Sequence, residues 1–518
     1  MSLFFHVALG GSSLVLAEEL SVHSLDPLRK GVREHVLSNG LKVLFYRRAE
    51  APIFSGIAAV RVGGVNEAVG KTGASHLFEH MAFKGSPVIG TKDYSKEVTL
   101  LRELEKLESK RQRGALSERD NAEIARVRSE LDAIWDVQEF TRLYRRWGAE
   151  GMNATTAKEL TNYFASFPKT AFEFWCWAQS ERLTRPVMRQ FYKERDVVLE
   201  ERRTRYENEP SGKLYEELLS HAFTVHPYRN PVIGYEEDVS QLTPDDVRDL
   251  HDKYYVASNI VIAVVGDLDF DKALPIIERY FSRIPSGRRP TPPRDVEPEQ
   301  NEERVFSVDF DASPVFFMGY KKPIFPDKAE PALSVFLEYI LGSRVAPLYR
   351  ELVIEKKMTS SLGFFEAPGD SYPNLAVFYG EPIAPYTNDQ VIAAFDEGIE
   401  RLLETPISNR ELKIVKRTVL KAALMGMQSN MGLADELAEN EQKFGTWQAS
   451  LQWYEQLLSL TTEDVMNAAR KYLQRSGRTV GLLSRGAKEA QVTKAQDSLV
   501  ASQALLVAPQ ASLVAPQG

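Results

Sequence analysis

Apolar positions along the chain form two kinds of pattern, short blocks that predict strands and longer stripes that predict helices. The apolar runs 36–37 and 41–45 flank Ser38-Asn39-Gly40, and Asn-Gly between apolar runs predicts a β-hairpin. Residues 57–62 predict the next strand, and Val305 to Tyr320 is strand-like again. The chain therefore opens with a strand-turn-strand unit and returns to strand structure in its second part.

A pattern near residue 242 recurs near residue 460. Tyr254 follows Leu242 by 12 positions, and Tyr472 follows Leu460 by 12 positions. In both copies a Thr directly after the Leu is a natural N-cap, and acidic residues occupy the first helical turn. A strand-like run follows each helix, at 260–265 and 480–483. The matched helix start, length and following strand indicate that the chain is duplicated.

The chain of 518 residues exceeds the size of one hydrophobic core, so two to four domains are expected. The segments we predict are a possible signal peptide (1–17), a first half (32–284), a Pro-rich linker (285–303), a second half (304–485) and a low-complexity tail (486–518). The segment 1–17 is apolar and ends in a small-residue cleavage pattern, although no basic residues precede it. It favours a periplasmic or secreted protein; without cleavage the location would be cytoplasmic.

A helical segment interrupts the first half. Leu100, Leu104 and Leu107 form one helical stripe, and a second stripe runs from Ile124 to Ile134. Gly114 breaks the first helix, and Ser117 with Asp120 resembles a capping box. We interpret residues 98–147 as an antiparallel helical hairpin, which is a surface decoration or a partner contact.

Composition excludes several classes of function. The chain is 43% hydrophobic and 26% charged, as in an ordinary globular protein. Its net charge of −8 argues against a nucleic-acid partner, because such proteins need a concentrated basic face. No apolar stretch is long enough to span a membrane. The single cysteine, Cys176, lies in an apolar run and is interpreted as a buried structural thiol.

The candidate chemistry lies in the run 75–81. On a helix His76 and His80 project from one face, and two imidazoles at that spacing suit two corners of a tetrahedral zinc site. Glu79 flanks the metal and is a candidate general base. The alternative is a pair of surface or capping histidines beside a carboxylate.

A third ligand is available on a later helix. Glu194, Val197, Val198 and Glu201 form one helical stripe, and carboxylates on a partly apolar stripe call for a cation. Glu201 would complete the ligand set, with Glu194 on the same face, whereas Glu200 should face solvent.

The remaining histidines do not suggest a second metal site. All eight histidines lie at or before position 251, so the second half cannot host a similar site. His226 is expected to be a loop or packing residue rather than a ligand.

Together these motifs resemble the pitrilysin or insulinase-like (M16) zinc metallopeptidases, in particular the shorter subfamily with mitochondrial processing peptidase and its bacterial relatives. The similarity covers most of residues 32–485. The runs that carry it are Ser38–Leu41, His76–Gly85, Asn153–Thr156, Glu194–Glu201 and His226–Gly234.

The resemblance implies a fold and a set of roles. The fold would be α+β, with two homologous LuxS/metallohydrolase-like halves that form half of a clamshell. One Zn²⁺ per chain would be held by His76, His80 and Glu201, with Glu194 as an accessory glutamate. The activity would be that of an endopeptidase for unfolded peptides, with Glu79 as general base. Asn153 and Ala154 would lie on an edge strand that pairs with the substrate backbone.

Two departures from the family pattern change the expected assembly. The gap from His80 to Glu201 is longer than relatives usually show, and the segment 98–147 accounts for most of the excess. Val353 and Ser360 stand where active single-chain relatives carry an Arg and a Tyr. This resembles the zinc-bearing subunit of a heterodimer whose partner supplies the Arg/Tyr pair. A homodimeric or monomeric peptidase and a non-catalytic structural relative with a vestigial site are the alternatives.

Overall fold

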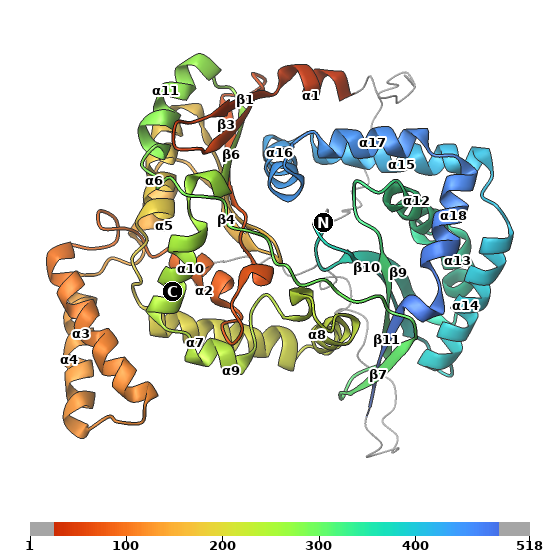
Figure 1. Ribbon diagram of the computed structural model, residues 1–518, viewed down its shortest axis with the longest axis horizontal. Helices are drawn as coiled ribbons and strands as arrows, with labels where there is room; N and C mark the ends of the chain where they lie inside the picture. The colour runs from red at the N-terminus through yellow and green to blue at the C-terminus, as the bar shows by residue number, and fades with distance from the viewer. Residues whose placement is uncertain (1–24, 486–518) are drawn as a thin grey trace.

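The computed structural model describes residues 25–485 and consists of two mixed sheets with helices around them (Figure 1). The predicted signal peptide (1–17) and the predicted tail (486–518) lie outside the described residues. Within residues 25–485 no helix is both long and apolar enough to cross a membrane.

The first sheet has six strands in the order β1-β2-β6-β3-β5-β4. Strands β2 and β6 are parallel, and the other neighbours are antiparallel. The bounds are β1 Arg33–Val36, β2 Lys42–Arg47, β3 Ile53–Val60, β4 Glu150–Thr156, β5 Thr161–Pro168 and β6 Ile260–Gly266. The predicted hairpin at Asn39-Gly40 is confirmed: Val36 pairs with Lys42, and Gly40 has a φ of 95° that suits glycine.

The second sheet has five strands in the order β7-β11-β8-β10-β9. Its strands are β7 Arg304–Asp309, β8 Val315–Lys322, β9 Thr359–Ala367, β10 Asn374–Pro382 and β11 Arg478–Ser484. Strands β7 and β11 are parallel, and the remaining pairs are antiparallel. Apart from β1, this order repeats that of the first sheet, with β7 in the place of β2 and β11 in the place of β6.

The helices also repeat. The first half contains α1 Asp26–Gly31, α2 Ala74–Met81, α3 Tyr94–Gln112, α4 Glu118–Ile134, α5 Glu139–Arg146, α6 Phe172–Thr184, α7 Phe191–Arg202, α8 Pro210–Ala222, α9 Glu236–Gln241, α10 Pro244–Tyr254 and α11 Phe270–Phe281. The second half contains α12 Ala329–Leu341, α13 Pro347–Tyr349, α14 Asn388–Glu404, α15 Asn409–Gly426, α16 Asn430–Phe444, α17 Ala449–Ser459 and α18 Thr462–Tyr472.

The predicted internal repeat corresponds to α10 with β6 and α18 with β11. Both helices have 11 residues and begin with a capping box, Thr243 with Asp246 and Thr461 with Asp464. A short 3-10 turn and a strand of seven residues follow each of them. The two homologous α+β halves are therefore confirmed.

Each sheet is covered partly by a helix of the other half. Helix α16 of the second half packs on β3 and β6, and α8 of the first half packs on β7, β8 and β11 (Figure 1). Side chains on opposite faces of β6 belong to different cores, with Ile262 facing the helices of the first half and Val261 facing the core that includes α16. This reciprocal packing buries both faces of the first sheet and binds the two halves into one body.

Three predicted boundaries differ from the structure. The strand-like run 305–320 is two strands, β7 and β8, because it bends before Pro314, and β11 lies between them. The strand predicted at 57–62 begins earlier, at Ile53. The segment 98–147 is not one hairpin: α3 and α4 pack on each other, whereas α5 places Phe140 and Tyr144 in the main core of the first half.

The hairpin of α3 and α4 projects from the first half, away from both sheets (Figure 1). The predicted end of its first helix and start of its second helix are confirmed. Helix α3 ends at Gln112 before Gly114, which has a φ of 68°. Helix α4 begins with the predicted capping box of Ser117 and Asp120.

Candidate metal centre

Helix α2 carries the two histidines in the interior of the first half. All eight of its residues are buried. The carboxylate of Glu67 accepts hydrogen bonds from the backbone N–H groups of Gly73 (2.9 Å) and Ser75 (2.8 Å) at the start of the helix. Gly73 has a φ of 86°, and a Cβ there would lie 2.5 Å from the carbonyl oxygen of Ile233. Glu67 and Gly73 therefore fix where the helix begins and which face His76 and His80 present.

Three ligand atoms converge between α2 and α7. His76 Nε2 lies 3.9 Å and His80 Nε2 lies 3.5 Å from Glu201 Oε2. Within residues 25–485 this trio is a group whose candidate ligand atoms lie within 4.8 Å of one another. Tetrahedral zinc with bonds of about 2.0–2.2 Å spaces its ligand atoms roughly 3.4 Å apart. The observed separations are close to that spacing and too long for hydrogen bonds between the groups.

The polar atoms around this point fit a bound cation. His76 Nδ1, His80 Nε2 and Glu79 Oε1 are buried, and none has a hydrogen-bonding partner among the described residues. Buried polar atoms without partners are costly and need an explanation, such as an ion or a water. Two imidazoles and one carboxylate with a fourth position open are a ligand set of catalytic zinc sites. The residues present therefore fit a zinc ion.

The charges of the trio differ because their neighbours differ. Burial and the nearby His80 lower the pKa of His76 to about 3. Burial also acts to lower the pKa of His80, but the carboxylates of Glu194 and Glu201 outweigh it and raise that pKa to about 9. Burial would raise the pKa of Glu201, but His80, His76 and Arg205 bring it down to about 2. A dication bound here would compete with the proton on His80, because a histidine binds metal in its neutral form.

Glu79 lies on α2 with one carboxylate oxygen held and the other free. It is fully buried, and Thr156 Oγ1 on β4 donates a hydrogen bond of 2.6 Å to its Oε2. Burial raises the pKa of Glu79 to about 7, against the lowering effect of the Thr156 hydrogen bond. The free Oε1 and a pKa near neutrality are the properties of a general base.

Glu194 contacts the site through His80. Its Oε2 lies 3.4 Å from His80 Nδ1, and its Oε1 accepts a hydrogen bond of 2.5 Å from Lys84 Nζ. Burial opposes ionisation of Glu194, but His80 and Lys84 prevail and lower its pKa. A carboxylate on the outer ring nitrogen fixes the tautomer and orientation of a ligating histidine.

The predicted stripe on α7 is correct except at one position. Glu194 and Val198 are buried, and Glu201 faces the histidines. Val197 is 42% exposed, because it lies at the edge of the stripe, about 60° from Glu194 around the helix. Glu200 faces solvent as predicted, with its side chain 68% exposed.

Arg205 is a charged group at the site that the sequence reasoning missed. Its Nη2 lies 2.8 Å from Glu201 Oε1, which leaves Oε2 directed to the histidines. It is presented by a π-helical turn, Arg203–Glu207, at the end of α7. The i, i+4 spacing from Glu201 is the signal that could have found it. Lys84 and Thr156 lie in motifs that the sequence analysis singled out, but their partners come from other elements.

The structure also places the predicted substrate strand and the two positions, 353 and 360, at which relatives carry an Arg and a Tyr. Asn153 and Ala154 lie on β4, the last strand at one edge of the first sheet, and α2 contacts this strand. Val353 is half-buried against the core of the second half. Ser360 is exposed on β9 and donates a hydrogen bond of 3.1 Å to Glu381 Oε2. His226 packs against Tyr372 at 4.7 Å between ring centroids, so it is a packing residue.

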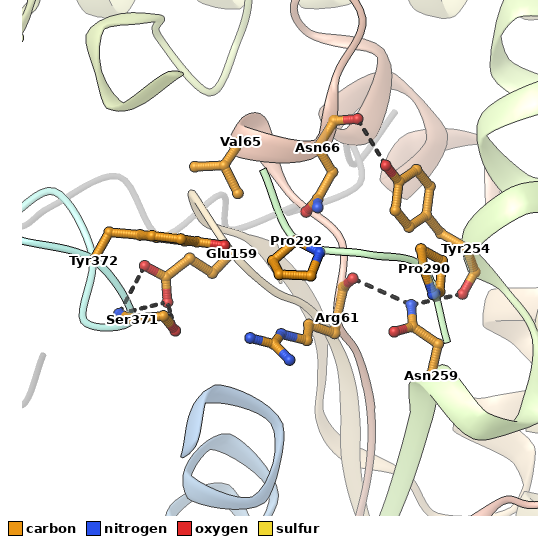
Figure 2. A pocket seen from close by; sticks show the side chains of 10 residues that line it. All are labelled: Arg61, Val65, Asn66, Glu159, Tyr254, Asn259, Pro290, Pro292, Ser371 and Tyr372. Carbon is orange, nitrogen blue, oxygen red and sulfur yellow. Dashed lines mark hydrogen bonds between the residues drawn. The ribbon is translucent and has the colours of Figure 1, made fainter. Parts of the chain in front are cut away.

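A separate hollow lies where the two halves meet, and Figure 2 shows its lining. Glu159 accepts hydrogen bonds of 3.0 Å from the backbone N–H groups of Asp370 and Ser371, and one of 2.6 Å from Ser371 Oγ. Its carboxylate also accepts a hydrogen bond from the hydroxyl of Tyr228. Among the residues that line this hollow, Glu159 alone is a candidate metal ligand, so this place joins the halves and is no second metal centre.

Proteins with sequences similar to this chain are described as peptidases or zinc proteases. A family model described as "Peptidase M16 inactive domain" matches residues 241–419. The chain is 25% identical over 484 residues to the "Zinc protease PqqE" of Helicobacter pylori, which covers 90% of this chain and 96% of that protein. It is 24% identical over 455 residues to an uncharacterized zinc protease of Mycobacterium leprae, which covers 86% and 90% of the two chains.

Solved structures share the fold. The crystal structure of a protease from Helicobacter pylori matches with a TM-score of 0.74 at 23% identity, over 88% of this chain and 99% of that chain. The periplasmic protease PqqL from Escherichia coli matches with a TM-score of 0.66 at 16% identity, over 88% of this chain but 48% of that chain. The fold therefore occurs both as a chain of this length and as half of a longer chain.

Proposed function

Because the chain belongs to the M16 peptidase family, we propose that it is a zinc-dependent endopeptidase that cleaves unfolded peptides. His76, His80 and Glu201 would hold one zinc ion per chain. The observation that carries the proposal is the convergence of their ligand atoms within 4.8 Å beside the unpartnered Oε1 of Glu79. Relatives described as zinc proteases over most of their length support it.

The residues around the centre divide the work of peptide hydrolysis. Zinc bound there would supply Lewis-acid chemistry, which polarises a carbonyl and makes water more acidic. Glu79 would accept a proton from the attacking water at Oε1 while Thr156 holds its other oxygen. Glu194 would keep the His80 ring in place, and Arg205 would keep Glu201 turned to the histidines.

The substrate would bind as an added strand. Asn153 and Ala154 lie on the edge strand β4, and the same strand supplies Thr156 to Glu79. Main-chain pairing along an edge strand gives affinity without demanding one sequence, and it requires an extended, unfolded peptide. An edge strand that leads directly to the general base suits an endopeptidase for such substrates.

We further propose that the chain works in a dimer. In PqqL the equivalent of this chain takes up 48% of the length, which leaves room for a second unit of this size in the same polypeptide. Val353 and Ser360 do not supply the Arg and Tyr expected of a self-sufficient unit. The second subunit would be a related chain that carries this pair, and a homodimer is the alternative. Mass measurement of the purified protein, alone and with co-expressed related chains, distinguishes the two.

The location proposed is periplasmic or secreted. The apolar segment 1–17 is the sequence feature behind it, and one structural relative is described as periplasmic. N-terminal sequencing of protein recovered from its cells tests this. A mature chain that begins after Ala17 is the expected result, and a chain that begins at Met1 in the cytoplasm would contradict it.

The test of the function combines metal content with hydrolysis. The purified chain is assayed for zinc and for cleavage of an unstructured fluorogenic peptide, with and without a candidate partner chain. About one zinc per chain and peptide cleavage are expected. A chain that holds no zinc under any of these conditions would instead be a non-catalytic relative with a vestigial site.

A further inference from the structure

A cavity of about 180 Å³ lies in the second half, between the sheet and helices α12, α16 and α17. It has room for several water molecules or for the end of one long side chain. Four carboxylates line it against one ammonium group; they are Glu330, Glu366, Asp370 and Glu436, and the cation is Lys322. The lining is therefore strongly acidic.

Three of the four carboxylates already have cationic partners. Lys322 Nζ lies 3.0 Å from Glu330 Oε1 and 2.5 Å from Glu366 Oε2, so one ammonium is shared by two acids. Asp370 is paired with Lys443 at 2.7 Å. These pairs use up the nearby cations and leave a surplus of negative charge in a partly desolvated place.

Two acceptors remain for a ligand. Glu436 forms no ion pair with any residue of the described range 25–485; burial raises the pKa of its carboxyl, and Glu439 adds to this, against the lowering effects of hydrogen bonds with Ser450 and Asn440 and of the nearby Lys443. Asn374 is 2% exposed, and its Oδ1 has no hydrogen-bonding partner, while its Nδ2 donates to the carbonyl oxygen of Gly369. The cavity lining thus contains an unpartnered buried carbonyl and a carboxylate without an ion-pair partner, and both favour a hydrogen-bond donor that carries positive charge.

Aromatic rings complete the wall and restrict the ligand's shape. Phe325, Phe444, Trp453 and Tyr454 line the cavity, and the Phe325 and Phe444 rings meet edge to face at 5.4 Å. Phe325, Phe444 and Trp453 are half-buried, so the cavity opens to solvent on this side. Aromatic faces beside carboxylates favour a guanidinium or an ammonium over a hydrated metal ion, because they attract organic cations and supply no metal ligands.

We propose that this acidic and aromatic cavity binds a guanidinium or ammonium group, with Glu436 and Asn374 as its acceptors. The site lies outside the candidate metal centre and does not depend on the proposed peptidase function. A loop connects it to that function: Asp370 lines the cavity, and its backbone N–H donates to Glu159 in the turn that follows β4. A basic side chain of a peptide on β4 is one source of the cation, and a free small amine is the other.

Agmatine, a guanidinium and ammonium compound of arginine-like length, is the probe. Calorimetric titration of the full chain should show saturable binding to one site. Glu436→Gln should weaken it by about tenfold or more, because a hydrogen bond to a charged acceptor becomes one to a neutral acceptor. Glu463→Gln is the matched control, because Glu463 is exposed on α18 and this substitution removes the same charge away from the cavity. Glu463→Gln should leave the affinity for agmatine unchanged.

The same titration on the zinc-free chain separates this inference from the peptidase proposal, because equal affinity with and without zinc is expected. Ser450→Lys, which would place an ammonium in the cavity, should abolish binding even if Glu436→Gln proves unstable. Competition by an Arg-containing peptide but not by its citrulline analogue, in the Glu79→Gln background, identifies a peptide side chain as the source; without competition the source is a free amine. No saturable binding of agmatine, or equal affinity in Glu436→Gln and Ser450→Lys, would overturn the proposal.

Discussion

Helices α2 and α12 occupy the same place in the two halves but bury opposite chemistry. Each follows the strand that lies next to the parallel pair of its sheet, β3 beside β6 in the first half and β8 beside β11 in the second. Helix α2 buries His76, Glu79 and His80, whereas α12 buries an apolar face that includes Leu333 and Phe336. The two positions therefore share a backbone and differ in their side chains.

Helices α7 and α15 differ from each other in the same way. Helix α7 turns Glu194 and Glu201 toward α2, but its counterpart α15 turns Leu412 and Leu420 into the core. An apolar helix pair is stable without a ligand, while buried groups without partners cost about 1–3 kcal/mol each. The comparison teaches that the fold does not require the site: at the positions of these four helices, the first half places a polar cluster where the second half has packed leucines and phenylalanines.

The largest effect is expected from Glu79, the carboxylate of α2. Glu79→Gln should lower kcat by about 10²–10⁴-fold, because Gln cannot accept the proton, while zinc stays bound. Steady-state hydrolysis and metal analysis of the same sample measure both. Glu200→Gln on the exposed side of α7 is the control and should be as active as the parent. Full activity of Glu79→Gln would remove the proposed mechanism.

Removal of the metal should affect one half only. Free zinc at 100 times its Kd stabilises the folded chain by about 2.7 kcal/mol, and chelation should remove that contribution. Hydrogen exchange should speed up in α2 and α7 and stay unchanged in α12 and α15. Equal loss of protection in both helix pairs would contradict the contrast between the halves.

A smaller loss is expected when the support of one ligand is removed. Glu194→Gln should lower zinc affinity by about 10–100-fold, because His80 loses the carboxylate on its outer nitrogen. Competition with a chromophoric chelator measures the affinity. Glu200→Gln, on the same helix, should bind zinc as the parent does. Unchanged affinity in Glu194→Gln would mean that the contact with His80 is incidental.

The smallest effect concerns the contact between the halves. Burial lowers the pKa of His226 to about 4, although Glu297 and Asp295 oppose this. In the unfolded chain the His226 imidazole takes up a proton below about pH 6.5, whereas in the folded chain it does so only near pH 4. The stability that depends on a neutral His226 is therefore fully present above about pH 6.5 and is lost as the pH falls to about 4. His226→Asn keeps an acceptor for the N–H of Tyr228 but does not titrate.

Between about pH 6.5 and about pH 4, the free energy of unfolding of His226→Asn should fall by about 1–2 kcal/mol less than that of the parent. Urea unfolding near neutrality and near pH 4.5 measures the difference. An identical pH dependence in the two proteins would exclude His226 as a source of acid sensitivity.

Local signals predicted much of the fold. The Asn39-Gly40 turn and the capping boxes at Ser117, Thr243 and Thr461 occur as expected, since each depends on a few neighbouring residues. The repeat was visible because both copies kept the same cap and helix length. Contacts between the halves were not predicted. No local pattern indicates that α16 covers the first sheet, or that the backbone of Asp370 and Ser371 binds Glu159.

The candidate site shows the same division. Helical spacing predicted that His76 and His80 share one face and that Glu194 and Glu201 share another, because one turn and two turns of a helix fix which residues share a face. That the two faces meet was expected from the family resemblance and not from spacing. The pairing of Thr156 with Glu79 and of Lys84 with Glu194 joins separate elements, so the chain order does not contain it. Val197 was assigned to the buried stripe because the spacing rule does not say where the edge of a stripe meets solvent.

The measurement that tests the central claim most directly is peptide hydrolysis through a cycle of chelation and zinc return. The purified chain, with its partner if one is required, cleaves an unstructured fluorogenic peptide before treatment. We expect cleavage to stop when zinc is removed and to return with about one zinc per chain. Cleavage that persists in a chain shown to contain no zinc would contradict the assignment of His76, His80 and Glu201 as the centre of a metallopeptidase.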